Sequence, residues 1–117
     1  ERTEGKTARK ISMQINNAFK GLQAEQAKEV VVAYEPLWAI GSGQAATAKD
    51  AQEVCHLIRE KLTTMFGEKI SRQVRILYGG SVNENNAVAF KISGIDGVLV
   101  GGASLNAKAF SAIVRSF

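Results

Sequence analysis

The sequence predicts an α/β protein built on a parallel sheet. Three apolar runs rich in β-branched residues, 30–36, 74–81 and 96–104, each stop at a glutamate or at a glycine pair. A parallel strand that is covered on both faces is a continuous apolar run of this kind. Segments with helical spacing of apolar residues precede, separate and follow the runs. This alternation favours parallel strands joined by crossover helices.

Four helices are expected. The first covers about residues 7–22 and ends near Gly21, and the second follows Thr47, which with Asp50 resembles a capping box. A short third helix is expected over 84–91, and a fourth lies near the C-terminus. The apolar faces of the four helices consist of Ile11, Ile15, Ala18, Phe19 and Leu22; of Ala51, Val54, Cys55, Ile58 and Leu62; of Val88, Phe90 and Ile92; and of Phe110, Ile113, Val114 and Phe117.

Length and composition restrict the class of protein. The chain has 117 residues, 45% hydrophobic and 22% charged, as in one ordinary soluble domain. No apolar run approaches the ~20 residues of a membrane span, and the polar N-terminus is unlike a signal peptide. A single cysteine excludes an internal disulfide and suits the cytoplasm. The net charge of +4 is dispersed, which argues against a nucleic-acid partner.

The predicted sheet is incomplete. Both outer strands of a three-stranded parallel sheet would be unpaired and apolar, which makes them templates for aggregation. The chain also begins with a helix that no strand precedes. We therefore expect residues 1–117 to be part of a larger sheet rather than a free-standing domain.

Glu35 is the first candidate for chemistry. It lies where an apolar run stops, directly before Pro36, and α/β enzymes place their sites beyond the carboxyl ends of parallel strands. Shielding by Trp38 and Ile40 in the next loop would make this carboxylate a stronger base. The alternative is a solvated glutamate at a strand end.

The loop from Pro36 to Thr47 has the composition of a lid. Proline stiffens its entry, and Gly41 and Gly43 allow close approach of the backbone to a ligand. An ordinary strand-to-helix connection is the alternative. Residues 41–46 also fit the dinucleotide pattern G-x-G-x-x-A, but these glycines do not directly follow the strand, and no strand ending in an acid lies ~20 residues on. No nucleotide cofactor is expected.

Glycine pairs end the other two strands, at 79–81 and 101–104, and a serine follows each pair. Glycine lets main-chain N–H groups approach an anion, and a helix expected to start near Ser104 would add its positive end. Together with Glu35, these loops predict base chemistry on an anionic, phosphorylated substrate.

Four further polar residues are interpreted as structural. His56 lies alone on the second predicted helix, without the convergent partners that catalysis or a metal site needs, and Cys55 lies on its apolar face. Arg59 and Asp96 are expected to be ion partners. No metal site is expected.

Several segments resemble the triosephosphate isomerase family. AYEPLWAIGSG (33–43) is similar to the family's catalytic-glutamate and lid segment, and ILYGGSV (76–82) and DGVLVGGASL (96–105) are similar to its two phosphate-binding segments. ERTEGKT (1–7) resembles the stretch after strand five. The resemblance implies a cytoplasmic, homodimeric (β/α)₈ barrel that interconverts dihydroxyacetone phosphate and glyceraldehyde 3-phosphate without a cofactor.

The resemblance also implies roles for residues. Glu35 would be the base, and Tyr78 with Ser81 would hydrogen-bond the closed lid. Arg59 and Asp96 would form a buried structural ion pair. Backbone amides for the phosphate would come from Gly41, Ser81, Gly101 and Gly102. The lid itself would consist of Pro36, Leu37, Trp38, Ala39, Ile40, Gly41, Ser42 and Gly43, with Ser42 in place of the family's usual threonine.

The resemblance implies that the chain is only the C-terminal half of the family's barrel, from helix five to helix eight and with strands six to eight. The family's asparagine and lysine at strand one, its histidine at strand four and its main dimer-forming loop have no counterpart here. We therefore expect residues 1–117 to be incomplete without an N-terminal half, and inactive alone. The alternatives are a half-barrel that only binds phosphate, another phosphate-binding barrel enzyme, and a fragment that self-associates through its open edges.

Overall fold

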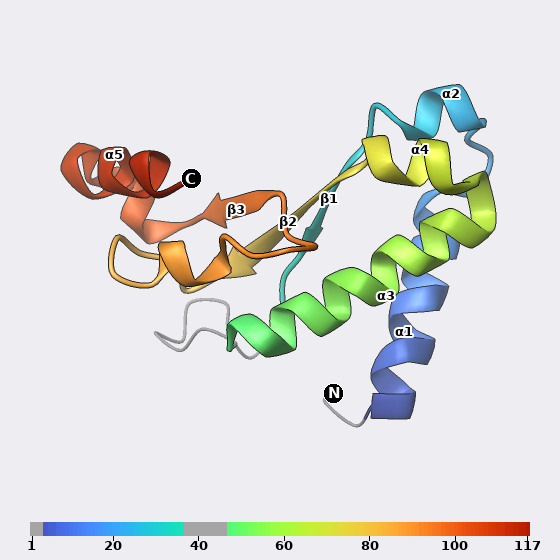
Figure 1. Cartoon of the computed structure of the whole chain (residues 1–117), viewed down its shortest axis with the longest axis horizontal. Helices are drawn as coiled ribbons and strands as arrows, with labels where there is room; N and C mark the ends of the chain where they lie inside the picture. Colours follow the sequence, from blue (N-terminus) through green and yellow to red (C-terminus); the bar gives the residue numbers. More distant parts are fainter. Residues whose placement is uncertain (1–3, 37–46) are drawn as a thin grey trace.

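The three predicted strands form one parallel sheet. The computed structural model describes residues 4–36 and 47–117. Within these ranges, β1 (Val31–Tyr34), β2 (Arg75–Gly80) and β3 (Gly97–Val100) pair in the order β1-β2-β3, and both pairs are parallel (Figure 1). The prediction of a parallel α/β fold is confirmed.

Helices precede, connect and follow the strands. They are α1 (Glu4–Ala18), α2 (Ala24–Ala27), α3 (Ala48–Phe66), α4 (Glu68–Gln73), the 3₁₀ helices η2 (Ala87–Phe90) and η3 (Gly102–Leu105), and α5 (Ala107–Ser116). The predicted cap of α3 is present, because the Thr47 hydroxyl accepts a hydrogen bond from the Asp50 N–H at 3.1 Å. α2 and α4 are missing from the sequence prediction because four and six residues are too few to show a helical period.

Three predicted helix bounds are wrong. α1 ends at Ala18 rather than near residue 22, because the chain turns through Gly21, whose φ of +85° is a left-handed conformation that favours glycine. The helix expected over 84–91 is only the 3₁₀ helix η2, which a turn precedes. The last α-helix begins at Ala107 rather than near Ser104.

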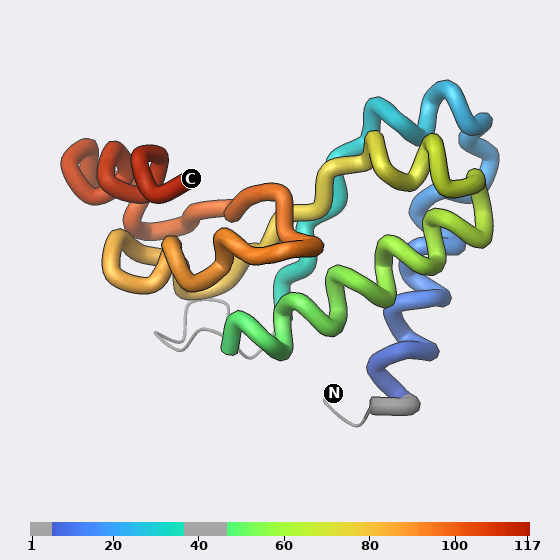
Figure 2. The backbone as a smooth tube through the Cα atoms, in the orientation of Figure 1, coloured from blue at the N-terminus to red at the C-terminus, as the bar shows by residue number. Residues whose placement is uncertain are grey.

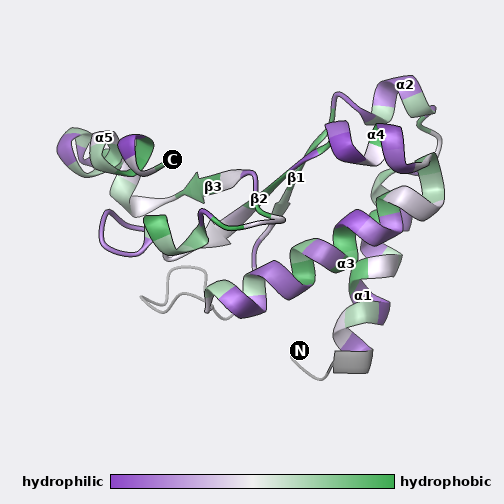
Figure 3. Cartoon of the chain, in the orientation of Figure 1, coloured by the Kyte–Doolittle hydropathy of each residue, from purple (hydrophilic) through white to green (hydrophobic). Residues whose placement is uncertain are grey.

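Helix α3 and the 3₁₀ helix η2 pack against one face of the sheet. α3 packs against β1 and η2, and α1 packs against α3 (Figures 1 and 2). Strand residues Ile76 and Tyr78 belong to the core, and Val32, Tyr34, Val98 and Val100 pack against it. Figure 3 shows how hydrophobic and hydrophilic residues are distributed over the helices and strands. The largest fully buried side chains of the core are Cys55, Ile58, Leu62, Val74, Ile76, Tyr78 and Phe90, together with the polar Ser71.

The other face of the sheet is open among the residues that the structure describes. Val31 is 53% exposed and Leu99 is 43% exposed, although both lie in strands. The sequence pattern is typical of strands that are covered on both faces of a larger sheet, and within the described residues only one face is covered. In the same ranges, no helix is long and apolar enough to span a membrane.

An ion pair between Arg59 and Asp96 connects α3 to the amino end of the sheet. The Arg59 guanidinium contacts the Asp96 carboxylate at 2.9 Å and donates to the carbonyls of Ser71 and Val74. The same Asp96 oxygen accepts the Ile76 N–H at 2.8 Å. The predicted pairing is confirmed, but the pair is not buried: the side chains are 23% and 41% exposed, because Asp96 lies at the edge of the sheet just before β3.

Candidate active site

The candidate residues follow the carboxyl ends of neighbouring strands. Glu35 comes directly after β1, Ser81 after β2 and Gly101 after β3. Because the strands are parallel and adjacent in the order β1-β2-β3, their carboxyl ends meet at one edge of the sheet. The structure therefore brings the predicted base and both predicted glycine loops to the same edge.

The Glu35 side chain lies across Gly79 of the neighbouring strand. Tyr34 is level with Tyr78, so the residues that follow them are also side by side. A Cβ atom built on Gly79 would stand 2.6 Å from Glu35 Cγ, which is closer than real Cβ atoms approach other heavy atoms, and 3.2 Å from Oε2. Any residue larger than glycine at position 79 would therefore displace the carboxylate.

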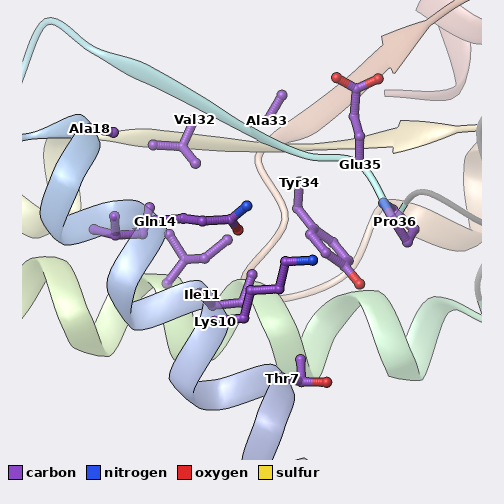
Figure 4. Close-up of a pocket in the computed structure, with 12 residues that line it drawn as sticks. Thr7, Lys10, Ile11, Gln14, Ala18, Val32, Ala33, Tyr34, Glu35 and Pro36 are labelled. Atoms are coloured by element: carbon purple, nitrogen blue, oxygen red, sulfur yellow. The ribbon is translucent and has the colours of Figure 1, made fainter. Parts of the chain in front are cut away.

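Glu35 points away from the helices. In Figure 4 its carboxylate extends from one side of β1, whereas the neighbouring Tyr34 extends toward α1 from the other. Glu35 is exposed. Pro36, which follows it, is buried. The predicted shield of Trp38 and Ile40 lies outside the described residues, as does the rest of the predicted lid from Leu37 to Gly43.

Tyr78 belongs to the opposite, helix-covered face of β2. It is fully buried, and its ring stacks on Phe90 with centroids 4.2 Å apart and planes 10° apart. The Tyr34 ring lies 6.5 Å from it in a tilted arrangement. Stacking in the core therefore fixes the Tyr78 side chain. Its contact with the lid stays a prediction, because the lid lies outside the described residues.

The loop after β3 holds the second glycine pair in open surroundings. A Cβ atom on Gly101 or Gly102 would meet no atom within 4 Å. The Ser104 hydroxyl donates to the Gly101 carbonyl at 2.6 Å, which closes the 3₁₀ turn η3. The α-helix behind this loop is capped by Asn106, whose side chain accepts the Ala109 N–H at 2.9 Å. The packing of the described residues therefore does not explain why both positions are glycine.

The residues interpreted as structural lie away from this edge. Burial raises the pKa of the Cys55 thiol to about 12, so the thiol remains protonated and is a poor nucleophile. His56 packs against the neighbouring loop, where a Cβ atom on Gly94 would stand 2.7 Å from its Cδ2 and Nε2 atoms. Within residues 4–36 and 47–117, no group of three or more histidine, cysteine or acidic residues could hold a metal ion.

A groove of about 400 Å³ lies between α1 and β1. Lys10 and Gln14 line it from α1, and Tyr34 lines it from β1 (Figure 4). Glu35 also contributes to its wall, but neither glycine loop does. The groove is therefore separate from the glycine loops, and it does not enclose the candidate site.

Sequence reasoning missed two features of the site. The sequence marks Gly79 only as a member of a glycine pair, although its lack of a side chain also leaves space for the Glu35 side chain. Asn86 was not singled out, although its side-chain amide donates to the Ser81 carbonyl at 2.8 Å. The strand register would reveal the first feature, and the recurrence of asparagine at 83 and 86 is a signal for the second.

Known proteins resemble the chain over nearly its whole length. The family model described as triosephosphate isomerase matches residues 1–117. The triosephosphate isomerase of Moorella thermoacetica is 52% identical over 116 residues, which are 98% of this chain and 46% of the relative. That of Carboxydothermus hydrogenoformans is 50% identical over 116 residues, which are again 98% of this chain and 46% of the relative. That of Saccharopolyspora erythraea is 54% identical over 99 residues, 84% of this chain and 38% of the relative.

These relatives are longer than the chain, which spans about half of the length of most of them. The match nevertheless covers the carboxylate and both glycine loops, because it extends from residue 1 to residue 117. The chain belongs to the triosephosphate isomerase family.

Proposed function

We propose that this chain is the C-terminal half of a triosephosphate isomerase, from helix five to helix eight of a (β/α)₈ barrel. In the whole protein it would provide the base and the phosphate site for the interconversion of dihydroxyacetone phosphate and glyceraldehyde 3-phosphate. The position of Glu35 across Gly79, at the same sheet edge as the loop at 101–102, is the observation that supports this most directly.

Glu35 would move the proton. Its carboxylate takes a proton from the substrate carbon next to the carbonyl, and the electron pair of that C–H bond forms an enediolate. The protonated carboxyl then returns a proton to the adjacent carbon while a hydroxyl proton passes from one substrate oxygen to the other, so no cofactor and no net oxidation are required. The exposed position of Glu35 on the open face leaves room for a substrate there.

Backbone amides would bind the substrate phosphate. In this proposal they belong to Gly41 of the lid, Ser81, Gly101 and Gly102. The open space around Gly101 and Gly102 supports this assignment, because an anion can approach the main chain there without meeting a side chain. The lid from Pro36 to Gly43 would close over the substrate and contact Tyr78 and Ser81.

The groups that stabilise the enediolate would come from the missing half. The open face of the sheet, with Val31 and Leu99 exposed, supports a complement that covers it. Without that complement the chain would have the base but neither the family's histidine at strand four nor its lysine at strand one, so we expect it to be inactive alone. Cytoplasmic localisation and homodimer assembly of the whole protein are parts of the same proposal.

Fusion to a relative tests this function. The part of the Moorella relative that this chain does not match would be joined to residues 1–117, and isomerisation would be measured for the fusion, its Glu35→Gln variant and the chain alone. We expect turnover in the fusion only, with a loss of ~100-fold or more in Glu35→Gln. Full turnover in Glu35→Gln would exclude Glu35 as the base. Turnover by the chain alone would contradict its incompleteness.

Two of the three alternatives would give distinct results with the same proteins. A half-barrel that only binds phosphate would bind the anion alone and give no turnover after fusion. A fragment that self-associates through its open edges would elute as a dimer or larger species in size-exclusion chromatography, because β1 and β3 each have an edge that no described strand pairs with.

A further inference from the structure

The loop that follows β2 is organised by two asparagine side chains. The Asn83 Oδ1 atom accepts the N–H groups of Asn85 at 2.8 Å and Asn86 at 3.0 Å. In return, the Asn86 Oδ1 atom accepts the Asn83 N–H at 2.8 Å. This reciprocal arrangement is that of a capping box, with asparagine at both positions, and it closes the turn that leads into η2.

Asn86 makes one more contact than a cap requires. Its Nδ2 atom donates to the Ser81 carbonyl at 2.8 Å. The partners fix the orientation of the carboxamide, because a backbone N–H can only donate and a carbonyl can only accept. A single side chain therefore joins the end of β2 to the beginning of η2.

The peptide between Ser81 and Val82 is held at both of its polar groups. Its carbonyl accepts from Asn86, and its N–H donates to the Gly80 carbonyl at 2.9 Å. Because the peptide unit is planar, two hydrogen bonds on opposite sides fix its rotation. The Gly80 carbonyl that accepts the Val82 N–H belongs to the same peptide unit as the Ser81 N–H, so the contact from Asn86 acts on the Ser81 N–H through these two linked peptides.

We propose that Asn86 is a positioning residue for phosphate binding. Its Nδ2 atom holds the Ser81 carbonyl and thereby orients the Ser81 backbone N–H toward the anion. The inference rests on the proposed phosphate site. Asn86 does not touch the substrate, and it acts through the hydrogen bond to Ser81. Asn86 accepts the Asn83 N–H with its Oδ1 atom and donates to the Ser81 carbonyl with its Nδ2 atom, so a substitution can remove one hydrogen bond and keep the other.

Asn86→Asp separates these two functions. The carboxylate keeps the oxygen that accepts the Asn83 N–H, but it has no donor for the Ser81 carbonyl and opposes that carbonyl with a second oxygen. Asn83→Asp is the matched control. This variant keeps the oxygen that accepts the N–H groups of Asn85 and Asn86, and it adds the same charge to the same loop. The hydrogen bond from Asn86 to Ser81 stays intact.

The test is titration of the 117-residue chain with inorganic phosphate, followed by backbone amide NMR. We expect saturable shifts at Ser81, Gly101 and Gly102 in the wild type. Binding in Asn86→Asp should be weaker than in Asn83→Asp by about three- to tenfold, which corresponds to the loss of one hydrogen bond. Thermal unfolding of all three proteins provides the structural control, and the two variants should unfold at similar temperatures.

The outcomes distinguish this inference from the proposed function. No saturable shift in the wild type would overturn the phosphate site, and this inference with it. Wild-type binding with equal affinities in the two variants would overturn only the role of Asn86. Unfolding of Asn86→Asp under conditions where Asn83→Asp stays folded would also overturn it, because Asn86 would then hold the fold rather than the ligand site.

Discussion

The Glu35 side chain crosses directly over Gly79, and a Cβ atom at position 79 would stand 2.6 Å from Glu35 Cγ. The contact joins the residue after β1 to the fifth residue of β2. Glycine at 79 therefore has a steric reason that is independent of any bound anion. The position of the carboxylate depends on the absence of a side chain one strand away.

Gly79→Ala should move the carboxylate. The added methyl group overlaps the Glu35 side chain, so Glu35 must adopt another rotamer while the exposed end of the side chain remains free to move. In the fusion protein we expect turnover to fall by ~100-fold, because small displacements of a base are costly. Met13→Ala is the control for turnover, since Met13 is 58% exposed on α1 and has no part in the proposed site. Unchanged kcat in Gly79→Ala would show that the contact does not position the base.

The sequence predicts the features of this site that are local, but not those that depend on register. Strand ends, the Thr47 cap and the pairing of Arg59 with Asp96 are confirmed. The contact between Glu35 and Gly79 depends on the alignment of Tyr34 with Tyr78, and an apolar run does not specify which residues of two strands are level.

Burial on the open side of the molecule could not be predicted either. The apolar periodicity of α5 indicates a packed face, but Phe110 and Val114 are 41% and 59% exposed. Periodicity reveals which residues share a face, and it does not reveal whether another element covers that face. Uncovered apolar faces at α5 and at the sheet are what a part of a longer relative would show.

Asp96→Ala should destabilise the fold. The Asp96 carboxylate oxygen accepts from both the Ile76 N–H and the Arg59 guanidinium, so its removal leaves two donors without this acceptor. We expect the free energy of unfolding to fall by about 1–3 kcal/mol, measured by urea denaturation. Glu68→Ala, which removes an exposed pair with Arg72 on α4, should cost no more than about 0.5 kcal/mol. Equal losses in the two variants would refute a special role for Asp96.

The free energy of unfolding should fall at alkaline pH because the buried Cys55 thiol ionises more readily in the unfolded chain. Burial raises the pKa of this thiol from 9.0 to about 12, so the folded chain keeps a proton that the unfolded chain releases. The stabilisation is therefore complete below about pH 9 and is lost as the pH rises toward 12. Urea denaturation of the wild type and Cys55→Ala should show a steeper alkaline decline in the wild type. Parallel declines would contradict the burial effect on the thiol.

Gly102→Val should abolish phosphate binding without unfolding the chain. The Cβ atom at this position meets no atom within 4 Å, and Gly102 has no left-handed φ, so the fold can accept a side chain there. The same open space is where the proposed anion approaches the main chain, and a valine would occupy it. Thermal unfolding should therefore change little while phosphate-dependent amide shifts disappear. Leu105→Val is the control, because Leu105 is 91% exposed in the same 3₁₀ helix and should leave binding intact. If Gly102→Val bound phosphate as the wild type does, the anion would not lie at the end of β3.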